Sequence, residues 1–296
     1  MSAETPYYRY PEAIVETDWL AANLADTNLR IFDCTTHLIY TPEGSADPYT
    51  VKSGRQDYEA SHIPGAGFLD LQGELSVQSS PFRFTLPPAE QFADAMSQHG
   101  IGNGVRVVLY SMGNAQWATR IWWMLRAFGF DNAAVLNGGW QKWQAENRPT
   151  STLPASYTAA RFVPQPRPDL FTGKKAVLEA IGDTGTCTIN ALGTALHNGD
   201  DNRYGRPGHV PGSVNIPAAL LLDPKTNCFL DPADAAMHFK DVGADKANRV
   251  ITYCGGGIAA TLDAFLLHQL GYEHIAVYDD SMSEWAKDAS LPMETG

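Results

Sequence analysis

The sequence predicts an α/β fold of two domains, each a mostly parallel sheet with helices on both faces. Three observations support this prediction. The chain has 296 residues, which is long for one such domain and sufficient for two. The same series of motifs occurs twice, and short runs rich in valine and isoleucine alternate with helical patterns. The expected division is a first domain at 1–150, a connector at 151–168 and a second domain at 169–296.

The internal repeat becomes visible when the two halves are compared. Each half contains, in order, a strand, an H-x-P-G turn, an apolar strand, a long helix and a last strand. In the first half these are LRIFDC (29–34), HIPGAGFLDL (62–71), VRVVLYS (105–111), AQWATRIWWMLRAFG (115–129) and AAVLNGG (133–139). In the second half they are TCTIN (186–190), HVPGSVNIPA (209–218), RVITYC (249–254), IAATLDAFLLHQLG (258–271) and HIAVYDD (274–280).

Several helix ends can be predicted from local signals. Thr17 and Thr172 are each expected to cap the first helix of a half. In the long helix of the second half, apolar residues recur every four positions, which predicts one buried face. Gly271 is expected to end that helix in a left-handed conformation, and Gly129 to end the corresponding helix of the first half.

Composition limits the classes of function. The formal net charge of −12 and the pI near 5.0 argue against nucleic acid as a partner, because binding phosphates requires a basic surface. An anionic substrate would need a local binding group that works against this overall charge. No run approaches the roughly 20 apolar residues of a membrane span, and the first residues do not resemble a signal peptide. A cytoplasmic protein with no membrane association is expected.

Cys254 is the strongest candidate for chemistry. It ends an apolar strand and is followed by three glycines and a helix, and ligands of open α/β sheets bind at the carboxyl ends of strands. Backbone amides of the loop residues Gly255, Gly256, Gly257, Ile258 and Ala259 can turn toward the sulfur. Together with the positive end of the helix, they would stabilise a thiolate or a persulfide anion.

The pattern of this loop also suggests two other kinds of site. Residues 255–260 satisfy G-x-G-x-x-A between a strand and a helix, and Asp279 follows about 20 residues later, as in a dinucleotide-binding motif. That motif normally opens a domain, whereas here only one strand and a short tail follow. A cysteine phosphatase would need an arginine that closes the loop around phosphate, and residues 259–261 are Ala, Ala and Thr.

The repeated H-[IV]-P-G turns, the cysteine loop, NAAVLNGGWQKW (132–143) and YDDSMSEW (278–285) together resemble the tandem rhodanese family. That family includes thiosulfate and 3-mercaptopyruvate sulfurtransferases, and the resemblance extends from about residue 12 to the end of the chain. It implies two rhodanese-like domains, in which Cys254 receives sulfur from a donor and passes it to a thiophilic acceptor. The first domain would be catalytically silent, because Ser111 stands at the position of Cys254.

The chain departs from the family pattern at positions that matter for the donor. Leu192 and Leu196 stand where the resemblance predicts arginines that hold an anionic donor. Arg203 and Arg206 are the nearest cations that could compensate. Gly256 stands where mercaptopyruvate-type members have a serine, so Asp70, which matches their interdomain aspartate, lacks the hydroxyl that would link it to the cysteine.

The remaining candidates have structural interpretations. His62 and His209 each lie in an H-x-P-G turn and are expected to bond backbone there. Five tryptophans are expected in the core or between the domains: Trp122, Trp123, Trp140, Trp143 and Trp285. Three cysteines lack a glycine loop and are expected to be bystanders, and their spacing suits neither a disulfide framework nor a metal site: Cys34, Cys187 and Cys228.

The sequence therefore predicts an enzyme without cofactor or metal, which moves a sulfane sulfur from a donor such as thiosulfate to cyanide, a thiol or an acceptor protein. Two alternatives stay open at this point. One is a 3-mercaptopyruvate sulfurtransferase. The other is a sulfur carrier or binding module that has lost turnover, because the expected arginines are missing.

Overall fold

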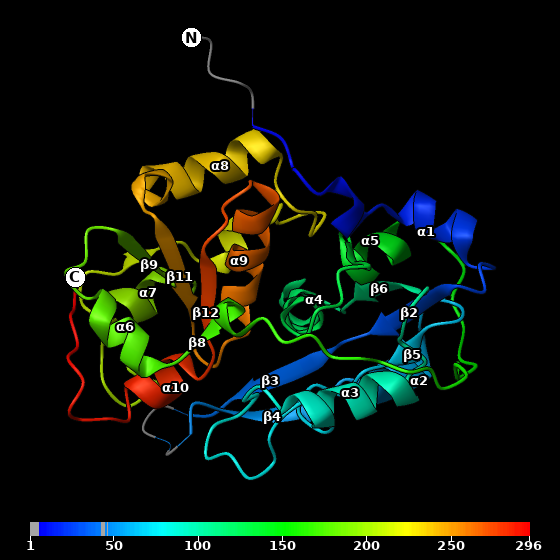
Figure 1. Ribbon diagram of the computed structural model, residues 1–296, viewed down its shortest axis with the longest axis horizontal. Coiled ribbons are helices and arrows are strands. Elements are labelled where there is room, and N and C mark those ends of the chain that lie inside the picture. The colour runs from blue at the N-terminus through cyan, green and yellow to red at the C-terminus, as the bar shows by residue number, and fades with distance from the viewer. Residues whose placement is uncertain (1–5, 43–44, 46) are drawn as a thin grey trace.

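The computed structural model describes residues 6–42, 45 and 47–296. Two five-stranded sheets lie side by side (Figure 1). The strand order is β1-β7-β6-β2-β5 in the first and, read from the opposite edge, β8-β12-β11-β9-β10 in the second. Every pairing within these sheets is parallel, and the two orders match strand for strand. The predicted fold of two mostly parallel α/β units is confirmed.

The first half contains the elements up to residue 145. Its strands are β1 (Ile14–Val15), β2 (Leu29–Asp33), β3 (Thr36–Tyr40), β4 (Tyr49–Ser53), β5 (Gly67–Phe68), β6 (Arg106–Tyr110) and β7 (Ala133–Leu136). Its helices are α1 (Thr17–Asn23), α2 (Arg55–Ala60), α3 (Ala89–Gln98), α4 (Gln116–Ala127) and α5 (Gly139–Ala145). β3 and β4 form a separate antiparallel hairpin, which was not predicted from the sequence.

The second half begins with β8 (Phe171–Thr172). Its other strands are β9 (Thr186–Asn190), β10 (Val214–Asn215), β11 (Arg249–Tyr253) and β12 (Ile275–Tyr278). Its helices are α6 (Lys174–Ala180), α7 (Thr194–Asn198), α8 (Pro232–Asp241), α9 (Ala259–Gln269) and α10 (Ser281–Trp285). No helix in the described part of the chain is long and apolar enough to cross a membrane.

Helices α4 and α9 pack against each other between the two sheets (Figure 1). The ring of Trp122 meets Phe265 edge to face, with centroids 4.8 Å apart. All residues from Ala260 to Gln269 are buried, so the expectation of a single buried face on α9 was wrong. One face of α9 covers its own sheet and another is covered by α4, because the two halves share one core.

The two halves repeat individual hydrogen bonds as well as strand order. The Tyr110 hydroxyl accepts a bond from the Ile63 amide at 3.3 Å, and the Tyr253 hydroxyl accepts one from the Val210 amide at 3.1 Å. In each case a tyrosine at the end of the central strand holds the residue after the turn histidine. The H-x-P-G turns are therefore fastened to the centre of each sheet.

The helix ends differ in part from the prediction. Thr17 is the first residue of α1, and its hydroxyl donates to Glu146 at 2.5 Å instead of capping the helix. Thr172 lies in β8, because pairing with β12 extends the backbone there. The left-handed helix ends are confirmed, with φ of +88° at Gly129 and +89° at Gly271.

Candidate active site

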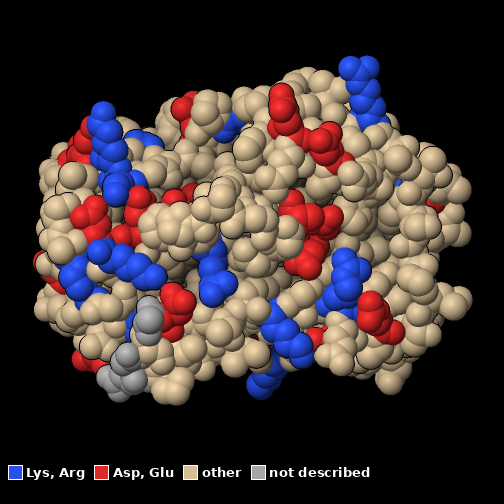
Figure 2. Space-filling model, turned by 90° about the horizontal axis from the view of Figure 1, so that it is seen from below, with Lys and Arg blue, Asp and Glu red and all other residues tan. Residues whose placement is uncertain are grey.

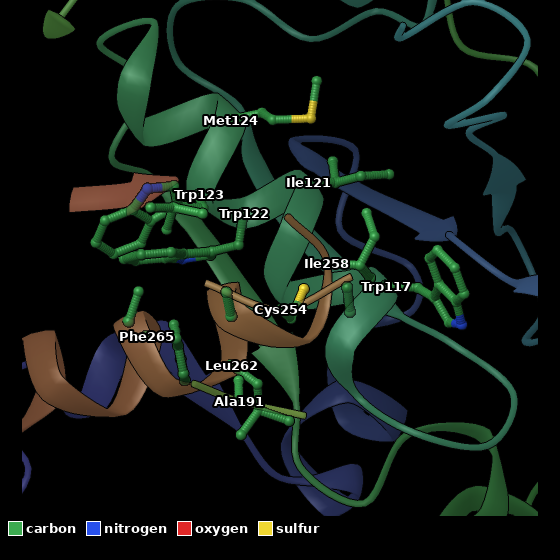
Figure 3. Close-up of a cluster of buried hydrophobic side chains, with 14 of the residues drawn as sticks. Trp117, Ile121, Trp122, Trp123, Met124, Ala191, Cys254, Ile258, Leu262 and Phe265 are labelled. Atoms are coloured by element: carbon green, nitrogen blue, oxygen red, sulfur yellow. The ribbon is translucent and has the colours of Figure 1, made fainter. Parts of the chain in front are cut away.

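Cys254 follows β11, the central strand of the second sheet, and the loop after it leads into α9. The side chain is only 2% exposed. Figure 3 shows it within the buried cluster to which α4 contributes Trp117 and Ile121, and α9 contributes Leu262 and Phe265. The cysteine thus lies at the carboxyl edge of its sheet and also beside the first half of the molecule.

The three glycines of the loop have different reasons to lack a side chain. A Cβ on Gly255 would lie 1.9 Å from the Tyr204 hydroxyl, and one on Gly257 would lie 2.3 Å from the Asp279 carbonyl oxygen. Gly257 also has a φ of +70°, which favours glycine. A Cβ on Gly256 would lie 3.2 Å from the Tyr49 hydroxyl, so this position has more room than its neighbours.

Backbone amides surround the start of α9. The amides of Cys254 and Gly257 donate to the Ser281 hydroxyl at 3.0 and 3.2 Å, and this hydroxyl donates to the Tyr278 carbonyl at 2.6 Å. Ser281 thereby fixes both ends of the loop. Four amides have no acceptor among the described residues, namely those of Gly255, Gly256, Ile258 and Ala259.

The first half covers the loop. Tyr49, at the start of β4, places its hydroxyl beside Gly256, together with the Phe84 ring and the Arg83 carbonyl. Phe84 has a φ of +65°, a conformation that is costly for a bulky residue and is held here by the packing of its buried ring. The loop therefore depends on segments about 170 to 205 positions earlier in the chain.

Two tyrosines bring phenol groups to the cysteine. Tyr49 is 3% and Tyr204 8% exposed. Burial raises the pKa of Tyr49 to about 12, and burial likewise raises the pKa of Tyr204 well above its usual value. Both hydroxyls therefore remain protonated at neutral pH and can donate hydrogen bonds to a charged sulfur or a departing oxygen.

A buried arginine joins the two halves at the loop. Arg120 on α4 donates to the Gly257 carbonyl at 3.1 Å and to the Phe84 carbonyl at 2.7 Å. It is also ion-paired with Asp279, which follows β12, at 2.7 Å. The other oxygen of Asp279 accepts the Leu86 amide at 2.7 Å. Arg120 and Asp279 thus fix the covering segment of the first half to the catalytic loop of the second.

The contacts of Asp279 argue against a dinucleotide-binding site. A ribose-binding carboxylate must face an open groove, but this side chain is occupied by Arg120 and Leu86. Gly255 and Gly257 likewise face protein atoms at close range. The loop has no space for a pyrophosphate on these glycines.

Ser111 follows β6, which has the same place in the first sheet as β11 in the second. The Trp140 amide donates to the Ser111 carbonyl at 3.2 Å, as the Met282 amide donates to the Cys254 carbonyl at 3.0 Å. The Ser111 hydroxyl donates to the Asn114 carbonyl at 2.8 Å and is buried. It is therefore engaged within its own loop.

Other candidates predicted from the sequence lie elsewhere or are engaged. The Asp70 carboxylate accepts the Gly73 amide at 3.0 Å, inside its own turn, so it does not make the interdomain contact expected of it. Arg206 donates to four backbone carbonyls between Trp285 and Leu291, at 2.6 to 2.8 Å. Its guanidinium holds the segment at the end of α10 and after it in place. No pair of its N–H groups remains free to bind an anion.

Arg203, Leu192 and Leu196 also make contacts within the protein. Arg203 pairs with Asp201, and its guanidinium lies over the Tyr40 ring, 4.6 Å from the ring centroid. Leu192 and Leu196 pack against the core cluster. Neither leucine replaces the charge of the arginines that the resemblance predicts.

The structural interpretations hold for the histidines and the tryptophans. His62 is fully buried, with its ring nitrogens 2.6 Å from the Tyr58 carbonyl and 2.9 Å from the Leu153 carbonyl. His209 Nδ1 lies 2.6 Å from the His197 carbonyl. All five predicted tryptophans are buried.

The three other cysteines are free thiols. Burial raises the pKa of Cys34 well above its usual value, and burial also raises the pKa of Cys187 to about 11. Neither forms a thiolate at neutral pH.

Sequence reasoning missed Tyr49, Arg83, Tyr204 and Arg120. These residues reach the loop from other elements, and nothing in their local sequence marks them. Ser281 lies within the motif at 278–285, and its place in that motif, shortly after a strand, was the one available signal.

Known proteins are similar to this chain over most of its length. A model of the rhodanese-like domain matches residues 16–146 and 199–288. The 3-mercaptopyruvate sulfurtransferase of Escherichia coli (strain K12) is 32% identical, over 95% of this chain and 97% of that protein. The thiosulfate sulfurtransferase of Gallus gallus is 30% identical, over 92% of this chain and 93% of that protein.

Solved structures show the same architecture. The crystal structure of SseA from Escherichia coli, a 3-mercaptopyruvate sulfurtransferase, covers 91% of this chain and 98% of its own, with a TM-score of 0.78 and 28% identity. The anaerobic ergothioneine biosynthesis enzyme of Chlorobium limicola covers 98% of this chain with a TM-score of 0.80, but at 20% identity it is similar in fold alone.

Proposed function

The chain belongs to the rhodanese family and is a sulfurtransferase, and from this premise we propose that Cys254 carries the transferred sulfur as a persulfide. The observation that supports this most directly is the set of free loop amides around a buried thiol at the carboxyl edge of β11. Such a nest of amides stabilises a terminal sulfur anion. The loop residues that serve it are Gly255, Gly256, Ile258 and Ala259, with Gly257 shaping the turn.

The first half-reaction begins with attack of the Cys254 thiolate on the outer sulfur of the donor. With thiosulfate, a new bond forms between the two sulfurs, the bond to the sulfonate sulfur breaks, and sulfite leaves with the electron pair. The products are the persulfide anion of Cys254 and sulfite, so charge and atoms balance. No proton is transferred in this step.

The second half-reaction moves the terminal sulfur to a nucleophile. Cyanide attacks that sulfur, the bond between the two sulfurs breaks, and the Cys254 thiolate is restored with release of thiocyanate. A thiol or an acceptor protein would react in the same way and become the new persulfide. The phenols of Tyr49 and Tyr204 can donate to the restored thiolate.

The donor is proposed to be a sulfane compound such as thiosulfate. Gly256 lacks the hydroxyl that could relay a proton to a departing enolate, and sulfite needs no such proton. One observation favours 3-mercaptopyruvate as a second candidate. The protonated Tyr49 hydroxyl lies 3.2 Å from the point where a side chain on Gly256 would begin, so it could supply the proton that pyruvate requires.

The decisive experiment is intact-mass analysis after donor treatment. The protein should gain one sulfur atom from thiosulfate or another donor, lose it to cyanide, and gain none after Cys254→Ser. Steady-state rates with cyanide then compare thiosulfate with 3-mercaptopyruvate. Labelling that survives Cys254→Ser would overturn the site, and stoichiometric labelling without turnover would identify a carrier.

The remaining assignments are proposed on the same basis. The first half, 1–150, is catalytically silent and is joined through 151–168 to the catalytic half, 169–296. The partners are a small sulfur donor and a thiophilic acceptor, which includes an acceptor protein in the cytoplasm. Fractionation of cells and capture of the persulfide by mixed-disulfide trapping test the location and the acceptor.

A further inference from the structure

A polar cavity of about 350 Å³ opens beside the catalytic loop, and both halves line it. Its inner wall includes Tyr49 and Arg83 from the first half and Ser283 from the second. The Tyr49 hydroxyl and the backbone carbonyl of Arg83 lie near Gly256, and the Ser283 hydroxyl donates to the Gly255 carbonyl at 2.6 Å. A small donor in this cavity would therefore lie against the loop that holds Cys254.

The cations around the site differ in what they already bind. Lys287, which also lines the cavity, pairs with Asp47 at 3.4 Å. Arg203 pairs with Asp201, Arg206 binds backbone carbonyls, and Arg120 pairs with Asp279. Each of these charges is neutralised or enclosed by protein groups.

Arg83 is different. It lines the cavity, is half-buried, and pairs with no carboxylate among residues 6–42, 45 and 47–296. Its charge lies close enough to the Tyr49 hydroxyl to favour the ionised phenol, although burial outweighs this effect on the Tyr49 pKa. A guanidinium and a phenol that line the same cavity can together bind an anion with two types of donor.

The face of the molecule beside the β3–β4 hairpin carries mixed charge (Figure 2). Figure 2, which views the molecule from the side of the β3–β4 hairpin, shows acidic and basic side chains interspersed. The net charge is −12. Long-range attraction is therefore absent, and binding depends on a local cation. Leu192 and Leu196 do not supply it, because both pack on the core.

We propose that Arg83, from the non-catalytic half, binds the anionic group of the sulfur donor, the sulfonate of thiosulfate or the carboxylate of 3-mercaptopyruvate. The inference rests on the proposed persulfide function of Cys254. Arg83 thereby takes the role for which the second half lacks arginines. The donor's anionic end faces the first half, and its outer sulfur faces Cys254.

The test compares kcat and KM for thiosulfate, 3-mercaptopyruvate and an uncharged alkyl persulfide, with cyanide as the acceptor. Loss of one charge-assisted contact in Arg83→Gln should lower kcat/KM for both anionic donors about tenfold to a hundredfold, mainly through KM. The uncharged donor should change less than about threefold, because it makes no charge-assisted contact with Arg83. Arg83→Lys should keep part of the affinity, because the charge remains without the planar fork.

Arg55→Gln is the matched control. Arg55 is exposed on the first half and lies over the Phe68 ring. Its replacement by glutamine changes the net charge by the same amount as Arg83→Gln. It should leave all donors unchanged. An Arg83→Gln variant that forms the persulfide and uses both anionic donors as well as wild type would overturn this inference alone. Absence of a Cys254 persulfide in wild type with every donor would instead overturn the proposed function.

Discussion

At the residue scale, the catalytic loop is defined by what surrounds each glycine. Gly255 touches Tyr204 and Gly257 touches the backbone of Asp279, whereas Gly256 has space for a small side chain beside Tyr49. In this run of three glycines, close contacts exclude a side chain at Gly255 and Gly257, whereas the contact at Gly256 is less severe. The position with space is the one at which the chain departs from the mercaptopyruvate-type pattern.

This difference predicts unequal effects of the smallest substitution. Gly255→Ala should lower the free energy of unfolding by about 1–3 kcal/mol, because the buried tyrosine cannot move aside. Gly256→Ala should cost less than about 1 kcal/mol, because its neighbour must shift only a few tenths of an ångström. Denaturant unfolding of both variants measures the difference. Equal losses would contradict the contacts described for Tyr204.

A buried acid of the first half gives a prediction for pH. Burial raises the pKa of Asp33 to about 6, and its carboxylate accepts the Thr35 amide at 2.8 Å. An aspartate in an unfolded chain titrates near pH 4, so folding favours the protonated form. The stabilisation is fully present below about pH 4 and is lost as pH rises through about 6.

The Asp33→Asn variant isolates this effect because asparagine does not titrate. Between pH 7 and pH 4 the unfolding free energy of wild type should rise relative to the variant by about 2 kcal/mol. Unfolding in denaturant at several pH values measures it. A difference that stays constant over this range would show that Asp33 titrates normally.

At the scale of elements, the same strand, loop and helix occur twice, but only one copy is equipped for chemistry. The loop between β11 and α9 has four free amides and two phenols beside it. In the loop between β6 and α4, the Ser111 hydroxyl is bonded to the Asn114 carbonyl. A cysteine placed in the loop between β6 and α4 should therefore not create an active site.

Variants at Ser111 test this. Ser111→Ala should keep turnover within about twofold, since an unactivated hydroxyl is a poor nucleophile. The double variant Ser111→Cys with Cys254→Ser should transfer no sulfur, because its thiol lacks the amides and the cavity. Rates with thiosulfate and cyanide, with circular dichroism as the folding control, measure both. Turnover by the double variant would show that the first half retains a working loop.

At the scale of the whole molecule, the two halves behave as one structure. Tyr157 of the connector accepts the Ile31 amide at 2.9 Å, and the Arg9 amide near the N-terminus donates to the Gln269 carbonyl at 2.7 Å. The connector is thus bonded to the first half, and the N-terminal segment is bonded to the second half. Arg120 completes the connection at the catalytic loop.

The buried position of Arg120 predicts a large effect on stability. Arg120→Met leaves Asp279 without its cation and two carbonyls without a donor, and should lower the unfolding free energy by about 3–5 kcal/mol. Arg126→Met on the same helix is the control. Arg126 pairs with the half-exposed Asp131, and its loss should cost less than about 1 kcal/mol.

Activity separates a purely structural role from a role in shaping the loop. At a temperature where Arg120→Met remains folded, its kcat should still fall, because Gly257 and the Phe84 segment lose their shared donor. Thermal unfolding and steady-state rates on the same samples measure both quantities. An unchanged kcat in the folded variant would limit Arg120 to stability.

The sequence by itself determined the repeat, the parallel strands, the left-handed ends at Gly129 and Gly271, and Cys254 as the residue to examine. These follow from local causes, namely hydrophobic period, backbone freedom of glycine and the order of motifs. The tertiary structure decided what surrounds that cysteine. Tyr49, Arg83 and Arg120 reach it across about 130 to 205 residues of chain, and Asp70 and Arg206 turned out to be bonded elsewhere. Such contacts depend on how the two sheets pack through α4 and α9, and that packing has no local signal in the sequence.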